Sequence, residues 1–215
     1  MSLETKYTKI SAKSNGNAII RVIPGHFATT HSHISYYVDM TILKSRRSEA
    51  VAAASVMASR YSMNTYIDTI ICMDGCEVIG AYLAEDLTNS GIMSINLHQT
   101  MYVVSPEVNS GGQLIFRDNM QMMIRGKHCL LLLASATTGR TIARAMECVE
   151  YYGGMVAGVS AIFSAIDKVN GHDINAIFTK DDIPGYQTFD AASCPMCARG
   201  ERIEAIVNSY GYSKL

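Results

Sequence analysis

The sequence predicts an α/β fold in which a mainly parallel, twisted sheet has helices on both faces and a small N-terminal hood beside it. Apolar runs without polar alternation, at 128–134 (HCLLLLA) and 155–166 (MVAGVSAIFSAI), are typical of strands buried on both faces. Helical stretches alternate with these runs, as right-handed crossovers between parallel strands require. With 215 residues, 48% of them hydrophobic, the chain is long enough for one domain with a sizeable core.

Each element follows from its local pattern. The runs 18–23 and 34–43 read as strands around a loop at 24–33, whose Gly, Pro, Thr and His residues break periodicity. This hairpin region forms the predicted hood. Four strands follow at 67–73, 101–105, 128–134 and 155–166, and helices are expected at 47–61, 77–91 and 141–154.

Three segments describe the expected organisation. Residues 1–18 form a flexible N-terminus, residues 19–190 form the domain with its hood at 19–45, and residues 191–215 form a C-terminal element and tail. Ligands of parallel sheets bind at the carboxyl ends of the strands. We therefore expect the functional loops at 73–76, 105–113, 135–141 and 164–171.

Composition excludes two classes of partner. The formal net charge is −1 and the Lys and Arg residues are scattered, which argues against nucleic acid. No apolar run approaches the roughly 18 residues that span a bilayer, and the first residues lack a signal-peptide core. We expect a cytoplasmic protein whose cysteines are mostly reduced.

The most informative segment joins the apolar run at 128–134 to the helix after it. Backbone N–H groups at a helix start attract phosphate, and hydroxyls and a glycine make close approach possible. The candidate phosphate-binding residues are Ser135, Ala136, Thr137, Thr138, Gly139, Arg140 and Thr141. A simple threonine N-cap followed by a glycine turn is an equally good interpretation of the same residues.

The Thr137-Thr138-Gly139 sequence resembles the end of the phosphoribosyl-diphosphate loop of type I phosphoribosyltransferases. The segment GHFATTHSHISYYVDM (25–40) resembles the N-terminal part of orotate phosphoribosyltransferases, and SCPMCARG (193–200) is similar to a Cys-Pro-Leu-Cys element in one bacterial branch of that family. The resemblance covers roughly residues 20 to 200.

This resemblance implies a 5-phosphoribosyl or nucleotide ligand, transfer of the phosphoribosyl group to a base, a role in pyrimidine biosynthesis, Mg²⁺ and a homodimer. It places a diphosphate-binding loop at Met73, Asp74, Gly75 and Cys76. It makes Phe27 and Tyr37 base-side candidates, although a core role for Phe27 is as good an interpretation.

Three departures concern the charged residues of the family. The acidic pair that contacts the ribose hydroxyls falls on Leu133 and Ala134, and Phe163-Ser164 replaces an Asp-Arg that holds orotate. No Lys or Arg lies between His98 and Arg117, where the family has a loop with lysines. No catalytic residue is therefore predicted. Three hypotheses remain open: an enzyme, a catalytically inactive sensor and a purely structural protein. Arg117, Arg125 or Lys127 near the cleft would favour the enzyme.

Metal-ligating residue types occur in two places. His31 and His33 flank Ser32, and we favour a hydrogen-bonded loop over a metal site there. Cys194 and Cys197 have knuckle spacing, but no second Cys or His pair follows them. Such a pair suits reduced thiols, a labile disulfide or half of an intersubunit metal site, and a structural turn is the preferred interpretation. No metal site is predicted.

Overall fold

The computed structural model describes residues 7–89, 94–97 and 100–215. Its core is a sheet with the strand order β10-β11-β9-β8-β4-β5. The strands from β11 to β5 are parallel, and only β10 is antiparallel to its neighbour. The core strands are β4 (Thr69–Cys72), β5 (Tyr102–Val104), β8 (His128–Ala136), β9 (Met155–Ser164), β10 (Lys168–Val169) and β11 (His172–Thr179).

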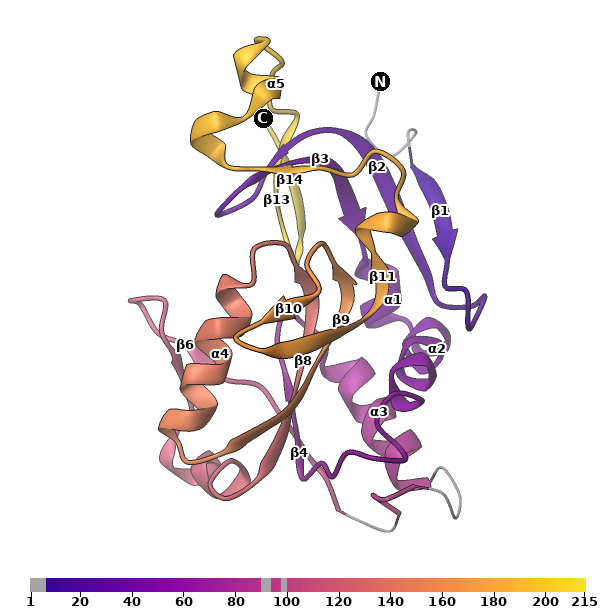
Figure 1. Cartoon of the computed structure of the whole chain (residues 1–215), viewed down its shortest axis with the longest axis vertical. Coiled ribbons are helices and arrows are strands. Elements are labelled where there is room, and N and C mark those ends of the chain that lie inside the picture. Colours follow the sequence, from indigo (N-terminus) through magenta and orange to yellow (C-terminus); the bar gives the residue numbers. More distant parts are fainter. Residues whose placement is uncertain (1–6, 90–93, 98–99) are drawn as a thin grey trace.

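Helices cover both faces of this sheet, as predicted (Figure 1). Helices α2 (Arg47–Ala58) and α3 (Glu77–Asn89) lie on one face and α4 (Arg140–Tyr151) on the other. The core is accordingly divided into two apolar clusters, one built around α2 and α3 and the other around α4. Strand β8 contributes alternate residues to both clusters, with Leu130 and Leu132 in one and Leu131 and Leu133 in the other.

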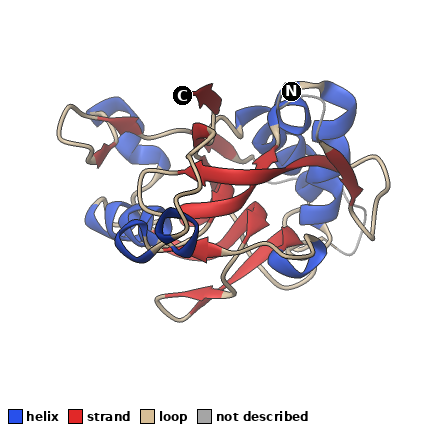
Figure 2. Ribbon diagram, turned by 90° about the horizontal axis from the view of Figure 1, so that it is seen from above, coloured by secondary structure: helices blue, strands red, loops and turns tan. Residues whose placement is uncertain are grey.

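The hood is a second sheet, above the core in Figure 1, with the order β12-β3-β2-β13-β14 and with β1 paired to β2. Its strands are β1 (Thr8–Ser11), β2 (Ile19–Ala28), β3 (His33–Asp39), β12 (Thr188–Phe189), β13 (Ala205–Asn208) and β14 (Gly211–Lys214). Figure 2, seen from the hood side, shows helices on both sides of the strands.

Several sequence-based boundaries differ from the structure. Strand β2 continues through 24–28, which were expected to be a loop, because this stretch pairs with β3 across an irregularity between Pro24 and Phe27. Thr41–Ser45, of which 41–43 were expected to be a strand, forms helix α1. Within the predicted flexible N-terminus, Thr8–Ser11 forms β1, and residues 1–6 lie outside the described part. The predicted end of the helix at 77–91 also falls partly outside it.

The remaining elements are short. Strands β6 (Glu107–Val108) and β7 (Leu114–Ile115) form a hairpin, followed by the 3-10 helix η2 (Asp118–Met123). Two more 3-10 helices, η3 (Lys180–Asp182) and η4 (Ala191–Ser193), and the single turn α5 (Pro195–Ala198) precede β13.

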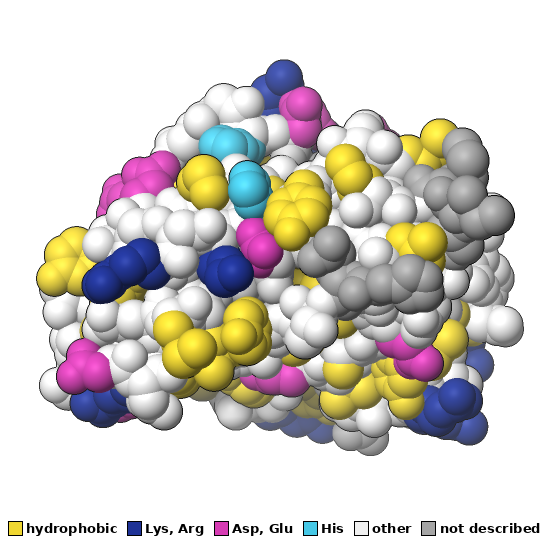
Figure 3. All heavy atoms as spheres, turned by 90° about the horizontal axis from the view of Figure 1, so that it is seen from below, with side chains coloured by type: hydrophobic (Ala, Val, Ile, Leu, Met, Phe, Trp, Pro, Cys, Tyr) yellow, Lys and Arg dark blue, Asp and Glu magenta, His cyan; other side chains and the backbone are white. Residues whose placement is uncertain are grey.

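Two surface properties bear on the expected partners. Within the described residues, no helix is long and apolar enough to cross a membrane. On the described part of the face in Figure 3, basic side chains are separated and acidic ones lie among them. That part of the face therefore carries no continuous basic patch.

Candidate functional site

A cavity of about 210 Å³ lies between the hood and the carboxyl ends of the core strands. The hood contributes Thr29, Thr30, His31, Ile34, Tyr37 and Val38, and the end of β13 with the turn after it contributes Asn208 and Ser209. The core contributes Asp74 after β4, Phe163 in β9 and the whole stretch 135–142. This is the edge of a parallel sheet at which ligands bind.

All seven candidate phosphate-binding residues, 135–141, line this cavity. Ser135 and Ala136 end β8, and α4 begins at Arg140. The backbone N–H groups of Thr137, Thr138 and Gly139 have no hydrogen-bond acceptor among the described residues. They are free to donate to an anion at the positive end of the α4 dipole.

Gly139 gives this loop its shape. Its φ of 76° lies in the left-handed region, which favours glycine. A Cβ at this position would lie 2.5 Å from Cγ2 of Val169 and 3.0 Å from Cδ1 of Ile166. The loop is therefore held against the segment that connects β9 and β10.

A second cavity of about 430 Å³ shares part of its lining with the first. Its lining includes Lys180 and Asp190, and the residues that it shares with the first cavity are His31, Thr137, Thr138, Arg140 and Tyr186. The exposed side chain of Arg140 can thus reach a ligand in either cavity. Together the two volumes fall within the usual range for small-molecule sites, about 300–1,000 Å³.

The predicted diphosphate-binding loop contributes one residue to the cavity. Asp74 lines it, whereas Met73 and Cys76 are buried in the core and Gly75 is not among the lining residues. Burial raises the pKa of the Asp74 carboxyl above its ordinary value. The Ser209 hydroxyl, the Lys44 charge and the Ala134 N–H stabilise the ionised form but offset that rise only in part.

The segment after β13 lies directly against this loop. Lys44, which is only 8% exposed, donates from Nζ to the backbone oxygens of Asp74 and Ser209, both at 2.6 Å. The ring of Tyr210 lies 5.6 Å from the same Nζ and close to Gly75. The turn at Asn208–Tyr210, which we call the tail turn, therefore covers the position where the resemblance places diphosphate.

Sequence reasoning did not identify Lys44, Asn208 or Ser209 as site residues. Lys44 follows the apolar pair Ile42-Leu43, and a lysine in an apolar stretch is a weak signal on its own. The run Asn208-Ser209-Tyr210-Gly211 was visible as an unusual sequence, but nothing local indicated what it contacts.

The two base-side candidates occupy different surroundings. Tyr37 lines the cavity, and burial raises the pKa of its phenol. Phe27 is fully buried in the apolar cluster of the hood, with its ring centroid 6.1 Å from that of Tyr37. Its position corresponds to the core role, and Phe27 does not line the cavity.

The cations that would indicate transfer chemistry lie elsewhere. Arg117 forms a two-point ion pair with Glu107, at 2.7 and 2.6 Å. Arg125 lies beside Gln121, and Lys127 faces Asp68 at the opposite edge of the sheet. Among the described residues that line either cavity, none of these three is present.

Three of the positions at which the family has charged residues are occupied here by buried apolar side chains. Leu133 and Ala134 are fully buried, and Phe163 packs edge-on against Tyr186 with ring centroids 4.9 Å apart. Glu77, the acid that follows Asp74 in the sequence, does not line either cavity; it begins α3 and accepts a hydrogen bond from Ser105.

His31 and His33, two residues apart, do not share a site. His31 lines both cavities, whereas His33 faces His26 and Cys197 within the hood.

Comparison with known proteins gives a structural likeness only. No protein-family model matches the sequence, and no curated protein matches it. The structure is similar to UMP synthase from Leishmania donovani (TM-score 0.54, 15% identity, 76% of this chain and 34% of that one). It is also similar to orotate phosphoribosyltransferase from Aeropyrum pernix (TM-score 0.54, 17% identity, 75% and 90%).

A third likeness is to orotate phosphoribosyltransferase from Mycobacterium tuberculosis H37Rv in complex with Fe(III) dicitrate (TM-score 0.50, 12% identity, 83% and 90%). This chain spans about a third of the length of the Leishmania protein. At these identities the likeness establishes architecture and leaves activity to the residues of the site. The chain therefore has the fold of the type I phosphoribosyltransferases.

Proposed function

We propose that this protein binds a ligand with a 5′-phosphorylated ribose, such as a nucleoside 5′-monophosphate, and acts as a sensor that does not transfer the phosphoribosyl group. The observation that carries the proposal is the loop at 137–139, whose free N–H groups face a cavity beside Arg140. A phosphate dianion there accepts hydrogen bonds from the backbone and from threonine hydroxyls.

The tail turn supports binding without transfer. It lies over Asp74 and Gly75, and the carbonyl oxygens of Ser209 and Asp74 take two of the three N–H donors of Lys44. A leaving diphosphate needs cations that stabilise its developing charge. Lys44 is already committed to two carbonyl oxygens.

Transfer of the phosphoribosyl group to a base is the second candidate function, and the position of Asp74 in the cavity lining favours it. Its carboxyl is the one acid that lines the first cavity within the described residues. Carboxylates are preferred ligands of Mg²⁺, so a magnesium-bound phosphoribosyl diphosphate would have its protein ligand there. A homodimer, orotate as the base and a place in pyrimidine biosynthesis remain predictions from the family resemblance.

Titration calorimetry tests the proposal. The ligands are UMP, AMP, ribose 5-phosphate, orotate and phosphoribosyl diphosphate, each with and without Mg²⁺. We expect a monophosphate to bind without requiring Mg²⁺. Thr138→Asp, which places a negative charge at the loop, should weaken this binding at least about tenfold, or about 1.4 kcal/mol. The matched control is Ser55→Asp, which adds the same charge at an exposed position of α2.

Two results would contradict the proposal. Absence of binding for every ligand would eliminate the phosphate site. Binding of phosphoribosyl diphosphate that requires Mg²⁺, followed by diphosphate release when a base is added, would establish the transferase instead.

A further inference from the structure

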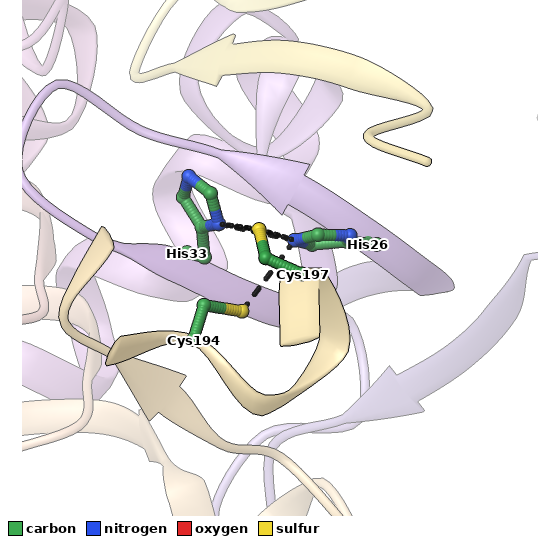
Figure 4. Close-up of side chains that lie close together, drawn as sticks. All are labelled: His26, His33, Cys194 and Cys197. Atoms are coloured by element: carbon green, nitrogen blue, oxygen red, sulfur yellow. Dashed lines mark hydrogen bonds between the residues drawn. The ribbon is translucent and has the colours of Figure 1, made fainter. Parts of the chain in front are cut away.

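Four metal-ligating side chains, none of which lines either cavity, meet on one side of the hood (Figure 4). We call them the hood cluster: His26, His33, Cys194 and Cys197. Their ligand atoms all lie within 4.8 Å of one another. His26 and Cys194 are each 3% exposed and His33 is 8% exposed, whereas Cys197 lies at the surface.

The two histidines share one face of the hood sheet. Strand register pairs Ala28 with His33 and Phe27 with Ile34. Paired residues share a face, so Ala28 lies on the same face as His33, while Phe27 and Ile34 point to the opposite face. His26 lies within the irregularity before Phe27, and its Nε2, 3.0 Å from Nδ1 of His33, places it on the His33 face. A hairpin therefore presents two imidazoles side by side, with ring centroids 5.0 Å apart.

The two cysteines approach from a segment far along the chain. Cys194 precedes α5, and Pro195 occupies the first turn of that helix, where a missing N–H costs nothing. The single turn places Cys197 beside Cys194, and both sulfurs point toward the imidazoles in Figure 4.

Hydrogen bonding alone does not account for this arrangement. Nδ1 of His26 lies 2.9 Å from the backbone oxygen of Glu201, which can only accept, so Nδ1 carries the proton. In the neutral ring, Nε2 then has one lone pair. That lone pair faces three neighbours, which are Nδ1 of His33 at 3.0 Å and the sulfurs of Cys194 and Cys197 at 3.6 and 3.7 Å. One lone pair cannot accept a full hydrogen bond from all three.

The distances are close to those around a tetrahedral ion. With metal–nitrogen bonds of about 2.0–2.1 Å and metal–sulfur bonds of about 2.3 Å, ligand atoms lie about 3.3–3.8 Å apart. The contacts of His26 Nε2, and that of Cys197 Sγ with His33 Nδ1 at 3.3 Å, span 3.0 to 3.7 Å, and all the ligand atoms lie within 4.8 Å of one another. The Glu201 carbonyl is also the kind of second partner that orients a ligating histidine.

We propose that the hood cluster binds a structural zinc ion. Two thiolates and two imidazoles in tetrahedral arrangement are a zinc donor set, and four protein ligands leave no open position for catalysis. Binding releases the two thiol protons to solvent. The ion joins the β2–β3 hairpin to the segment that leads from β12 into β13, and so fixes the strand that carries the tail turn.

The test uses the full chain purified from zinc-supplemented cells, with metal content measured by mass spectrometry. We expect one zinc per chain. The zinc content should fall to background in Cys197→Ser. It should persist in Cys148→Ser and His172→Ala, which alter the same residue types outside the cluster. Cys197 is exposed, so its replacement leaves the apolar core intact.

A second measurement does not depend on any variant. Wild-type protein, stripped by a chelator under reducing conditions and loaded with Co²⁺, should show thiolate-to-cobalt charge transfer and the intense visible bands of tetrahedral cobalt. A chelator should also lower its unfolding temperature.

The proposal is overturned if folded, reduced protein takes up neither zinc nor cobalt in this way. It is also overturned if the isolated chain contains a Cys194–Cys197 disulfide, detected as a loss of two hydrogens by intact mass. None of these readouts depends on nucleotide binding, so the zinc site and the proposed function succeed or fail separately.

Discussion

Lys44 shows how one side chain can link three segments of the chain. Its ammonium is almost completely buried and donates to carbonyl oxygens from the loop after β4 and from the tail turn. A buried charge is tolerated only when it is hydrogen-bonded. The residue therefore couples the position of the tail turn to that of Asp74.

Replacing this lysine should weaken the fold substantially. Lys44→Met keeps the length of the side chain but leaves two partly buried carbonyls without their donor, and we expect a loss of about 1–3 kcal/mol in the free energy of unfolding. Urea denaturation measures it. Lys168→Met is the control, because Lys168 and its partner Asp173 are both exposed and that pair should contribute little. Similar losses in both variants would mean that the Lys44 contacts do not stabilise the protein.

Asp68 provides a pH-dependent contribution at the opposite edge of the core sheet. Burial alone would raise the pKa of Asp68, but the backbone N–H and the ring of His128, with Lys127 beyond them, hold it below its ordinary value. A depressed pKa in the folded state stabilises the protein above the unfolded-state pKa. That stability is lost as the pH falls through the folded-state value.

Asp68→Asn should therefore be less stable than the wild type near neutral pH, by about 1–2 kcal/mol. The gap should close in the acid range, as the pH falls below about 4 and through the folded-state pKa. Urea denaturation at a series of pH values measures the difference. A gap that is constant across the series would assign the effect to packing and not to ionisation.

The loop between β8 and α4 depends on glycine at one position. Gly139→Ala introduces both a left-handed alanine and a contact with Val169, and we expect it to cost about 2–4 kcal/mol. Gly126→Ala is a matched control, because its φ of 69° is similar and nothing lies within 4 Å of its Cβ. The control should cost about 1 kcal/mol. Equal costs in thermal or urea unfolding would show that the loop moves away from Val169 without penalty.

At the scale of elements, the strands that the sequence predicted correctly are those whose local residue pattern determines their structure. Strands β8 and β9 are mostly apolar because both faces are buried over most of their length, and their runs stand out. Strand β11, near the edge, mixes His172, Asp173 and Asn175 with apolar residues and is mostly half-buried, so its pattern was not recognised. In β2, Pro24 and Gly25 read as loop residues, but pairing with β3 prevails over local preference.

At the scale of the whole molecule, prediction failed where distant segments meet. The phosphate loop was found because 135–141 is one continuous stretch. The hood cluster was not found, because a search downstream of Cys197 misses histidines that precede it by more than half of the chain. The tail turn was missed for the same reason, since its partners Lys44 and Asp74 belong to segments much earlier in the sequence.

The pairing of β13 with β2 has a consequence for biosynthesis. Ala205 pairs with Phe27, so β2, one of the first strands to be synthesised, cannot complete its pairing until β13, one of the last, has been made. Until then the nascent hood keeps an unpaired edge and the cavity lacks one wall. Contacts of this sequence separation slow folding, and the exposed edge is open to pairing with other chains. The cavity is thus completed only after synthesis has passed Asn208, and the edge of β2 stays exposed in the growing chain during that interval.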